Sequence, residues 1–140
     1  MALSQPFPNS AQLQADLIAL RQWEQRLRYL LLLGRDYPHT DIMRPEFSVF
    51  GCEAAVWVNI QADHSNTETR WWFVSHSESR LVAGLLLVLL APIQGKTRDE
   101  VSAFQAADWL QACGLEQQLS PSRNNGLHRV LKTVKSSVCA

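Results

Sequence analysis

Apolar residues recur at intervals of three or four positions through the first third of the chain, the period of a helix with one apolar face. They are Leu13, Leu17, Leu20, Trp23, Leu27, Leu30 and Leu31. Ser10 suits the N-cap of such a helix. Gly34 suits the position just past a helix end, and Pro38 prevents the helix from resuming. We therefore predict that the first third is helical, with a break near Arg21 or Gln22.

The spacing of the apolar residues changes from three or four positions to two in the middle of the chain. Apolar and polar residues alternate from Val56 to Gln61, which is typical of a half-buried strand. Residues 62–67 are polar and rich in turn formers, and Thr69 to Val74 contains aromatic residues that favour strands. We predict a β-hairpin with a long turn over this region. Ser48 to Phe50 is predicted to form a further short strand.

Helical patterns return after the hairpin. Residues 81–90 are apolar all round, so we predict a central buried helix with Ser77 as its N-cap. The stretch Thr97-Arg98-Asp99-Glu100 matches a capping box and predicts another helix start. Gly114 is expected to stop the helix that precedes it. Ser120-Pro121 opens the last helix, because proline is favoured in a first helical turn.

These elements predict an α+β fold, in which several helices pack against a small antiparallel sheet. The chain has 140 residues, and a domain usually has roughly 100–200. No internal repeat or linker divides it. We therefore expect a single domain over residues 1–140, with residues 1–9 as a loose lead-in.

Composition narrows the class of partner. The chain has 13 basic and 13 acidic residues and a formal net charge of zero, and no run of basic residues forms the stripe that phosphate binding needs. Nucleic-acid binding is therefore disfavoured. The longest apolar run, Leu81 to Pro92, is shorter than the roughly 20 residues that a membrane-spanning helix needs. The N-terminal residues do not resemble a secretory signal. We expect a soluble cytoplasmic protein without a membrane partner.

The stretch Gly51-Cys52-Glu53-Ala54-Ala55-Val56-Trp57 contains the most interesting cysteine. Cys52 follows a glycine, which tolerates backbone angles that other residues avoid, and precedes the predicted strand that starts at Val56. A thiol in that position can be presented to a partner from the tip of a bend. Free cysteines are nevertheless often inert core residues, so both interpretations stay open at this point.

The other candidate groups have simpler explanations. The chain has three cysteines, an odd number without a C-x-x-C pair, which favours a reducing compartment. Cys113 lies on the apolar side of a predicted helix and is expected to pack in the core. Cys139, next to last in the chain, is expected to fray. The four histidines are spread out and do not have metal-ligand spacing, and no nucleotide-binding or hydrolase motif is present. We expect neither a bound metal nor a cofactor.

His76 stands at the predicted junction between the hairpin and the central helix. An imidazole and a helix N-terminus both lower the pKa of a nearby thiol, so His76 is a candidate for tuning Cys52. A solvated junction histidine is the simpler explanation.

The order and spacing of several motifs resemble the SufE/CsdE family of sulfur acceptors for cysteine desulfurases. The likeness runs from about Leu17 to Val134. The matching segments are Trp23-Glu24, Leu32-Leu33-Gly34, Gly51-Cys52 with Val56-Trp57, the helix of residues 81–90 opened by Ser77-Glu78, Leu119-Ser120-Pro121-Ser122-Arg123, and Gly126-Leu127.

This resemblance implies a fold like that of the IscU-like iron–sulfur scaffold proteins, and a mechanism. A SufS-type or CsdA-type desulfurase, which carries its own pyridoxal phosphate, would hold sulfur as a persulfide. Cys52 would take that sulfur as a persulfide of its own and pass it to a downstream acceptor or scaffold protein, in iron–sulfur cluster assembly or related sulfur trafficking. The protein would also stimulate the desulfurase, acting as an accessory carrier rather than a stand-alone enzyme.

Three residues are candidate supports for Cys52. Members of the family carry Gly-Asp before the serine of the central helix, where this chain has Ser75-His76; we predict that His76 tunes the thiol or is merely exposed. Arg123 matches the family's Ser-Arg pair and would steady a persulfide anion or cap the site electrostatically. Glu53, directly after the cysteine, is the third candidate.

Apolar neighbours of Cys52 suggest how the thiol is protected. Val49, Phe50 and Val56 flank it, and apolar burial raises the pKa of a thiol and blocks oxidants. We therefore expect the loop to hide Cys52 at rest and to swing it out when a desulfurase docks. Two alternatives remain: an interaction domain whose cysteine is structural, and a thiol redox enzyme in which Cys113 would have to come close to Cys52.

Overall fold

The computed structural model describes residues 7–52, 54–116 and 119–140. Within these ranges six α-helices accompany a three-stranded antiparallel sheet of order β1-β2-β3, which confirms the predicted α+β class. The elements are α1 (Ser10–Ala19), α2 (Trp23–Asp36), η1 (Thr40–Ile42), η2 (Pro45–Phe47), β1 (Val56–Asp63), β2 (Arg70–Ser77), α3 (Arg80–Leu90), η3 (Ala91–Ile93), β3 (Lys96–Thr97), α4 (Arg98–Ala103), α5 (Ala106–Ala112) and α6 (Pro121–Cys139).

The helical first third is broken where the sequence predicted. Helix α1 ends at Ala19, and Gln22 caps α2 in a reciprocal capping box with Gln25. Two details differ from the prediction. Asn9, not Ser10, caps α1, with its side chain accepting a hydrogen bond from the Gln12 amide at 3.0 Å. Gly34 lies inside α2 rather than beyond its end.

The position of Gly34 is explained by the packing of α2 against α3. A Cβ on Gly34 would meet the backbone of Arg80 and Gly84. A Cβ on Gly84 would collide with the carbonyl oxygen of Leu30. Each glycine thus lets the other helix approach its backbone directly. Gly34 is needed for this close approach, so it does not signal a helix end.

The predicted hairpin is present and longer than expected. Strands β1 and β2 pair in register from Val56 opposite Ser77 to Asp63 opposite Arg70. The short β3 pairs with the start of β2 and was not predicted. Ser77 belongs to β2 rather than capping the central helix; Ser79 is the N-cap, accepting from the Val82 amide at 3.2 Å. Ser48 to Phe50 forms only an isolated bridge, from Ser48 to Trp57.

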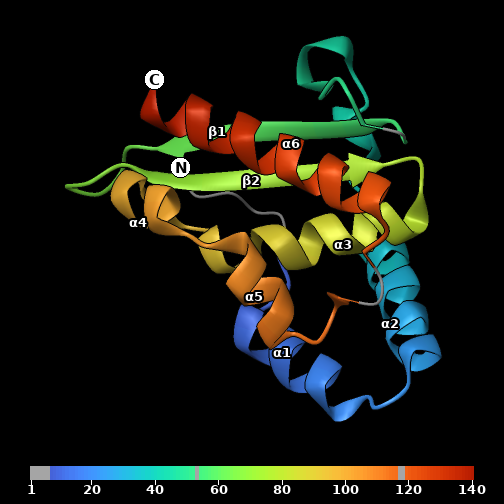
Figure 1. Ribbon diagram of the computed structural model, residues 1–140. Coiled ribbons are helices and arrows are strands. Elements are labelled where there is room, and N and C mark those ends of the chain that lie inside the picture. Colours follow the sequence, from blue (N-terminus) through green and yellow to red (C-terminus); the bar gives the residue numbers. More distant parts are fainter. Residues whose placement is uncertain (1–6, 53, 117–118) are drawn as a thin grey trace.

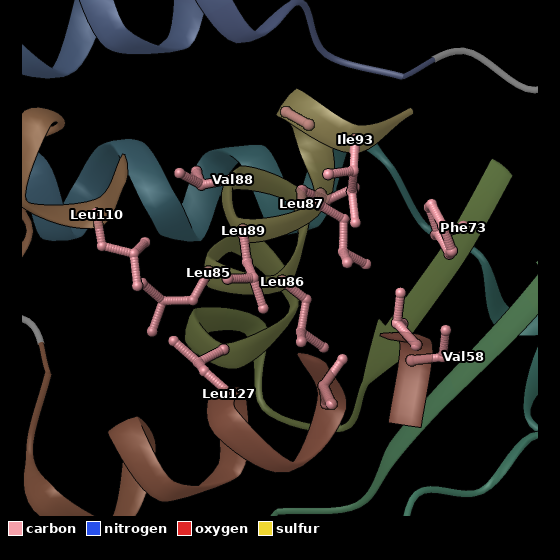
Figure 2. Close-up of a cluster of buried hydrophobic side chains, with 14 of the residues drawn as sticks. Val58, Phe73, Leu85, Leu86, Leu87, Val88, Leu89, Ile93, Leu110 and Leu127 are labelled. Atoms are coloured by element: carbon pink, nitrogen blue, oxygen red, sulfur yellow. The ribbon is translucent and has the colours of Figure 1, made fainter. Parts of the chain in front are cut away.

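Helix α3 is the centre of the core, as its apolar sequence predicted. Nine of its residues are buried: Leu81, Ala83, Gly84, Leu85, Leu86, Leu87, Val88, Leu89 and Leu90. Figure 2 shows side chains from both strands, from α5 and from α6 gathered around it, with Val58 and Phe73 on the sheet side, Leu110 from α5 and Leu127 from α6. In Figure 1, α6 runs beside the hairpin, while α1, α2 and α5 lie on the other side of α3.

The starts at Thr97 and Ser120 and the stop at Gly114 lie where the sequence indicated, but the helix expected between Thr97 and Gly114 is divided at Phe104 and Gln105 into α4 and α5. Thr97 and Glu100 form the predicted capping box of α4. Gly114, with φ of 71°, follows the end of α5. Ser120 caps α6, with Pro121 in its first turn. The buried stripe of α6 packs on the core, and this places the first turns of α6 beside the loop that carries Cys52.

Candidate functional site

Cys52 lies in a short loop whose two ends are fastened together. The Val49 amide donates to the Val56 carbonyl at 2.9 Å, which closes the loop at its base. The Ser77 hydroxyl donates to the Ala55 carbonyl at 2.7 Å. Gly51, with φ of 87°, makes the bend directly before the cysteine. The loop therefore has a fixed base on the sheet and a tight, glycine-dependent tip.

The thiol faces a pocket between this loop, α3 and the beginning of α6. Its volume is about 290 Å³. Its lining residues are Cys52, Ala54, Val56, Ser79, Val82, Leu85, Leu86, Ser120, Ser122, Arg123, Gly126, Leu127 and Val130. Apolar side chains of α3 and α6 form the floor, and serines and Arg123 form the more polar side. Cys52 is half-buried there, at the edge of the hydrophobic core, whereas Cys113 is buried inside it.

The surroundings of the thiol favour its protonated form. Cys52 Sγ donates a long hydrogen bond to the Gly126 carbonyl oxygen, at 3.9 Å. A carbonyl oxygen can accept a hydrogen bond from a thiol but has no hydrogen to donate to a thiolate. Burial raises the pKa of Cys52 above its usual value, and the guanidinium of Arg129 lowers it in part. At rest Cys52 is therefore a sheltered thiol with the Arg129 guanidinium nearby.

The polar side of the pocket is formed by two helix N-termini. Ser79 caps α3 and Ser120 caps α6, and both residues line the pocket beside Cys52. The N-terminal end of a helix carries a partial positive charge. Arg123, predicted as a supporting residue, lines the same pocket from the first turn of α6. This end of the pocket can accommodate a small anion better than an apolar group.

The structure does not bring His76 to Cys52. His76 pairs with Trp57 across the hairpin, and their rings stack with centroids 6.2 Å apart. Val56 is next to Trp57 and lines the Cys52 pocket, so His76 projects from the opposite face of the sheet. It borders a separate hollow of about 270 Å³ with Arg35, among other residues. Burial and then the charge of His39 lower the pKa of His76.

The remaining predicted residues have different outcomes. Glu53 lies outside the described residues. Cys113 is completely buried, as expected, and burial raises its pKa to about 11; it does not line the Cys52 pocket. Cys139 is exposed at the end of α6, with Sγ 2.9 Å from the Ser102 hydroxyl.

Sequence reasoning identified Arg123 of α6 but missed most of the other residues that line the site from the helices. Ser79 was overlooked because Ser77 was taken as the helix cap. Arg129 had no local signal, since it lies on the exposed side of an ordinary amphipathic helix. The spacing of Arg123, Gly126 and Val130 at three and four residues was a usable indication that they share one face of α6.

Among the residues described, no cluster of His, Cys, Asp and Glu side chains could hold a metal ion. No helix in the described part of the chain is long and apolar enough to cross a membrane.

A family model and individual relatives both place this chain near SufE proteins. Residues 11–138 match the SufE family, described as a domain associated with Fe–S metabolism. The sulfur acceptor protein CsdE of Escherichia coli is 33% identical over 117 residues, covering 82% of this chain and 78% of CsdE. An uncharacterized SufE-like protein of Haemophilus influenzae is 32% identical over 121 residues, covering 83% of this chain and 91% of that protein.

A solved structure supports the fold. The solution structure of a hypothetical protein from Thermus thermophilus aligns with a TM-score of 0.63 at 21% identity, covering 94% of this chain and 96% of that one. At that identity the likeness concerns the fold alone. The family match over nearly the whole chain, together with relatives that share about a third of its residues, shows that this chain belongs to the SufE family.

Proposed function

We propose that this protein is a sulfur carrier in Fe–S metabolism, which accepts sulfur on Cys52 from the persulfide of a SufS-type or CsdA-type cysteine desulfurase. The Cys52 thiolate attacks the outer sulfur of that persulfide. The bond between this sulfur and the desulfurase cysteine breaks as the new S–S bond forms. The desulfurase leaves as a thiolate and Cys52 becomes a persulfide, so no oxidant or reductant is needed. Pyridoxal phosphate belongs to the desulfurase.

The observation that carries this proposal is the empty space beside a half-buried thiol. A close-packed structural cysteine has no room for another atom, whereas the pocket at Cys52 has a volume of about 290 Å³. In liquid water each molecule occupies roughly 30 Å³, and a sulfur atom is of similar size. A persulfide is more acidic than its thiol, and the helix N-termini at Ser79 and Ser120 favour the anion. A carried sulfur atom therefore fits the pocket in size and in charge.

The half-burial of Cys52 suggests that the loop moves during transfer. A half-buried thiol reaches the persulfide of another protein less easily than an exposed thiol does. We propose that docking releases the contact between Cys52 and Gly126 and swings the loop outward about its fastened base. Iodoacetamide should then alkylate Cys52 slowly in the free protein and faster when a desulfurase is bound. An equal rate in both states would count against the movement.

Neither alternative function has a specific observation in its favour. A thiol redox enzyme needs a second cysteine close to the first, and no other cysteine is among the pocket residues described. A purely structural role would place Cys52 against neighbouring side chains rather than beside a pocket. Stimulation of the desulfurase and delivery to a scaffold or another downstream acceptor follow as further parts of the proposal.

The test is mass spectrometry of the protein after incubation with a purified SufS-type desulfurase and free cysteine. We expect one added sulfur atom on the peptide that contains Cys52. Cys52→Ser should lose the addition while it still folds and binds the desulfurase. Cys139→Ser removes an exposed cysteine outside the pocket and should leave the addition at Cys52 unchanged. If neither a SufS-type nor a CsdA-type desulfurase adds sulfur to Cys52, the acceptor function is ruled out.

A further inference from the structure

We propose that Arg129 is a positioning residue for sulfur acceptance, which holds the bend at Gly51 and provides the positive charge that faces the Cys52 thiolate. The proposal deepens the function proposed above, because that thiolate is the attacking group. Its test measures the thiol itself and needs no desulfurase. A failure of Arg129 in this role and a failure of the sulfur-acceptor function can therefore be told apart.

The first argument is the contact between Arg129 and the bend. A Cβ on Gly51 would lie 2.7 Å from Cζ, Nε and Nη1 of Arg129. Because these three atoms of the planar guanidinium are equally far from the Cβ position, the guanidinium turns its face toward Gly51. Only a residue without a side chain permits this approach, and its φ of 87° also favours glycine. The cation thus lies directly on the residue before Cys52.

The second argument is the arrangement of α6 around the thiol. Gly126 and Arg129 are three residues apart, so they are neighbours on the surface of one helix. The Gly126 carbonyl accepts from the protonated thiol. The Arg129 guanidinium attracts the thiolate. Helix α6 therefore offers one partner for each protonation state, and the thiol can lose its proton without leaving the surface of α6.

The third argument is the scarcity of other charges. The residues of β1 and α3 that line the pocket carry no charged side chains: Val56, Ser79, Val82, Leu85 and Leu86. Among the described residues, the only charged side chain in the lining is Arg123, in the first turn of α6. Arg123 and Arg129 are therefore the two cations to compare. Arg129 touches the bend that carries the cysteine.

The experiment is the pH dependence of iodoacetamide alkylation at Cys52, measured by peptide mass spectrometry on a Cys139→Ser background. The midpoint reports the pKa of the thiol, and the plateau at high pH reports access to it. Arg129→Gln should raise the midpoint by about half a pH unit, so that alkylation at pH 7.5 slows about threefold. The plateau should not fall. Arg129→Lys keeps the charge and should restore most of the midpoint.

Three control variants separate this role from others. Lys132→Gln removes an exposed charge from the same helix and should leave the midpoint unchanged. His76→Ala should also leave it unchanged, because His76 lies on the other face of the sheet. Arg123→Gln should shift it less than Arg129→Gln does.

Two results would overturn the proposal. The first is an alkylation midpoint in Arg129→Gln that equals that of the unmodified protein. If only the alkylation plateau rises in this variant, Arg129 merely restrains the loop, and the proposal fails as well. The second is a larger shift in Arg123→Gln than in Arg129→Gln. Circular dichroism of each variant confirms that the fold is retained, and Arg129 is exposed on its helix, so its substitution leaves the core intact.

Discussion

The contact between α2 and α3 and the loop that carries Cys52 are held in very different ways. At the first, two glycines bring backbones together, and buried leucines of both helices surround them. At the second, the described contacts of the bend include one sulfur–carbonyl contact of 3.9 Å and the side chain of Arg129, and Cys52 is only half-buried against the core. Both regions depend on a glycine that permits close approach. In one the approach is between two backbones, and in the other it is between a backbone and an exposed side chain.

This difference indicates which region can open. Local opening is easiest where few apolar contacts must be broken, and hardest in the core. The α2–α3 contact can open only when the whole domain unfolds. The Cys52 loop can open at its tip while the hydrogen bond between Val49 and Val56 holds its base. We therefore expect the loop that carries Cys52 to open more easily than the helical core.

A cysteine of the buried core and the cysteine of the loop should show the largest contrast. Cys113 is completely buried and its pKa is raised to about 11, so it should react with iodoacetamide only through global unfolding. Cys52 should react through opening of the loop alone. With a free energy of unfolding of at least about 5 kcal/mol, Cys113 should react at least ~10³-fold more slowly. The measurement is peptide mass spectrometry over time; similar rates would mean that the core opens with the loop.

Alanine substitutions of two helical glycines should have opposite effects on stability. A Cβ at Gly84 meets the Leu30 backbone, so Gly84→Ala should lower the free energy of unfolding by about 3 kcal/mol. A Cβ at Gly126 lies 3.9 Å from Cys52 Sγ, an ordinary contact. Gly126→Ala should raise the free energy of unfolding by roughly 0.5–1 kcal/mol, because alanine favours the helix. Urea unfolding measures both. Equal destabilisation would mean that the loop side is packed as tightly as the core.

The smallest effect on the free protein is expected at Phe50. This side chain is 83% exposed, two residues before Cys52, so a desulfurase that reaches the thiol must approach it. Exposed aromatic residues often carry much of the binding energy of an interface. Phe50→Ser should leave stability within about 0.5 kcal/mol and weaken desulfurase binding about tenfold.

The control for Phe50 is Ile18→Ser. Ile18 is 54% exposed on α1, which lies on the far side of α3 from the hairpin (Figure 1). Isothermal titration calorimetry with a SufS-type desulfurase should give the same affinity for this variant as for the unmodified protein. If Phe50→Ser and Ile18→Ser bind equally well, Phe50 is not part of the docking surface.

Most of the helices and the hairpin were predictable from the sequence because their signals are local. The leucine period of the first third, the alternation from Val56 to Gln61 and the cap at Ser120 each depend on neighbours a few residues away. The glycine before Cys52 indicated a bend, and the bend is there with its positive φ.

Only the tertiary structure decided how the distant parts meet. Gly34 has the local signal of a helix end, yet the approach of α3 requires glycine there and the helix continues. His76 is near Cys52 in the predicted order of elements, but the two-residue period of β2 turns it to the other face of the sheet. Arg129 reaches the Cys52 bend because the buried stripe of α6 fixes the rotation of that helix on the core. Local sequence determined the elements, and long-range packing of side chains determined the site.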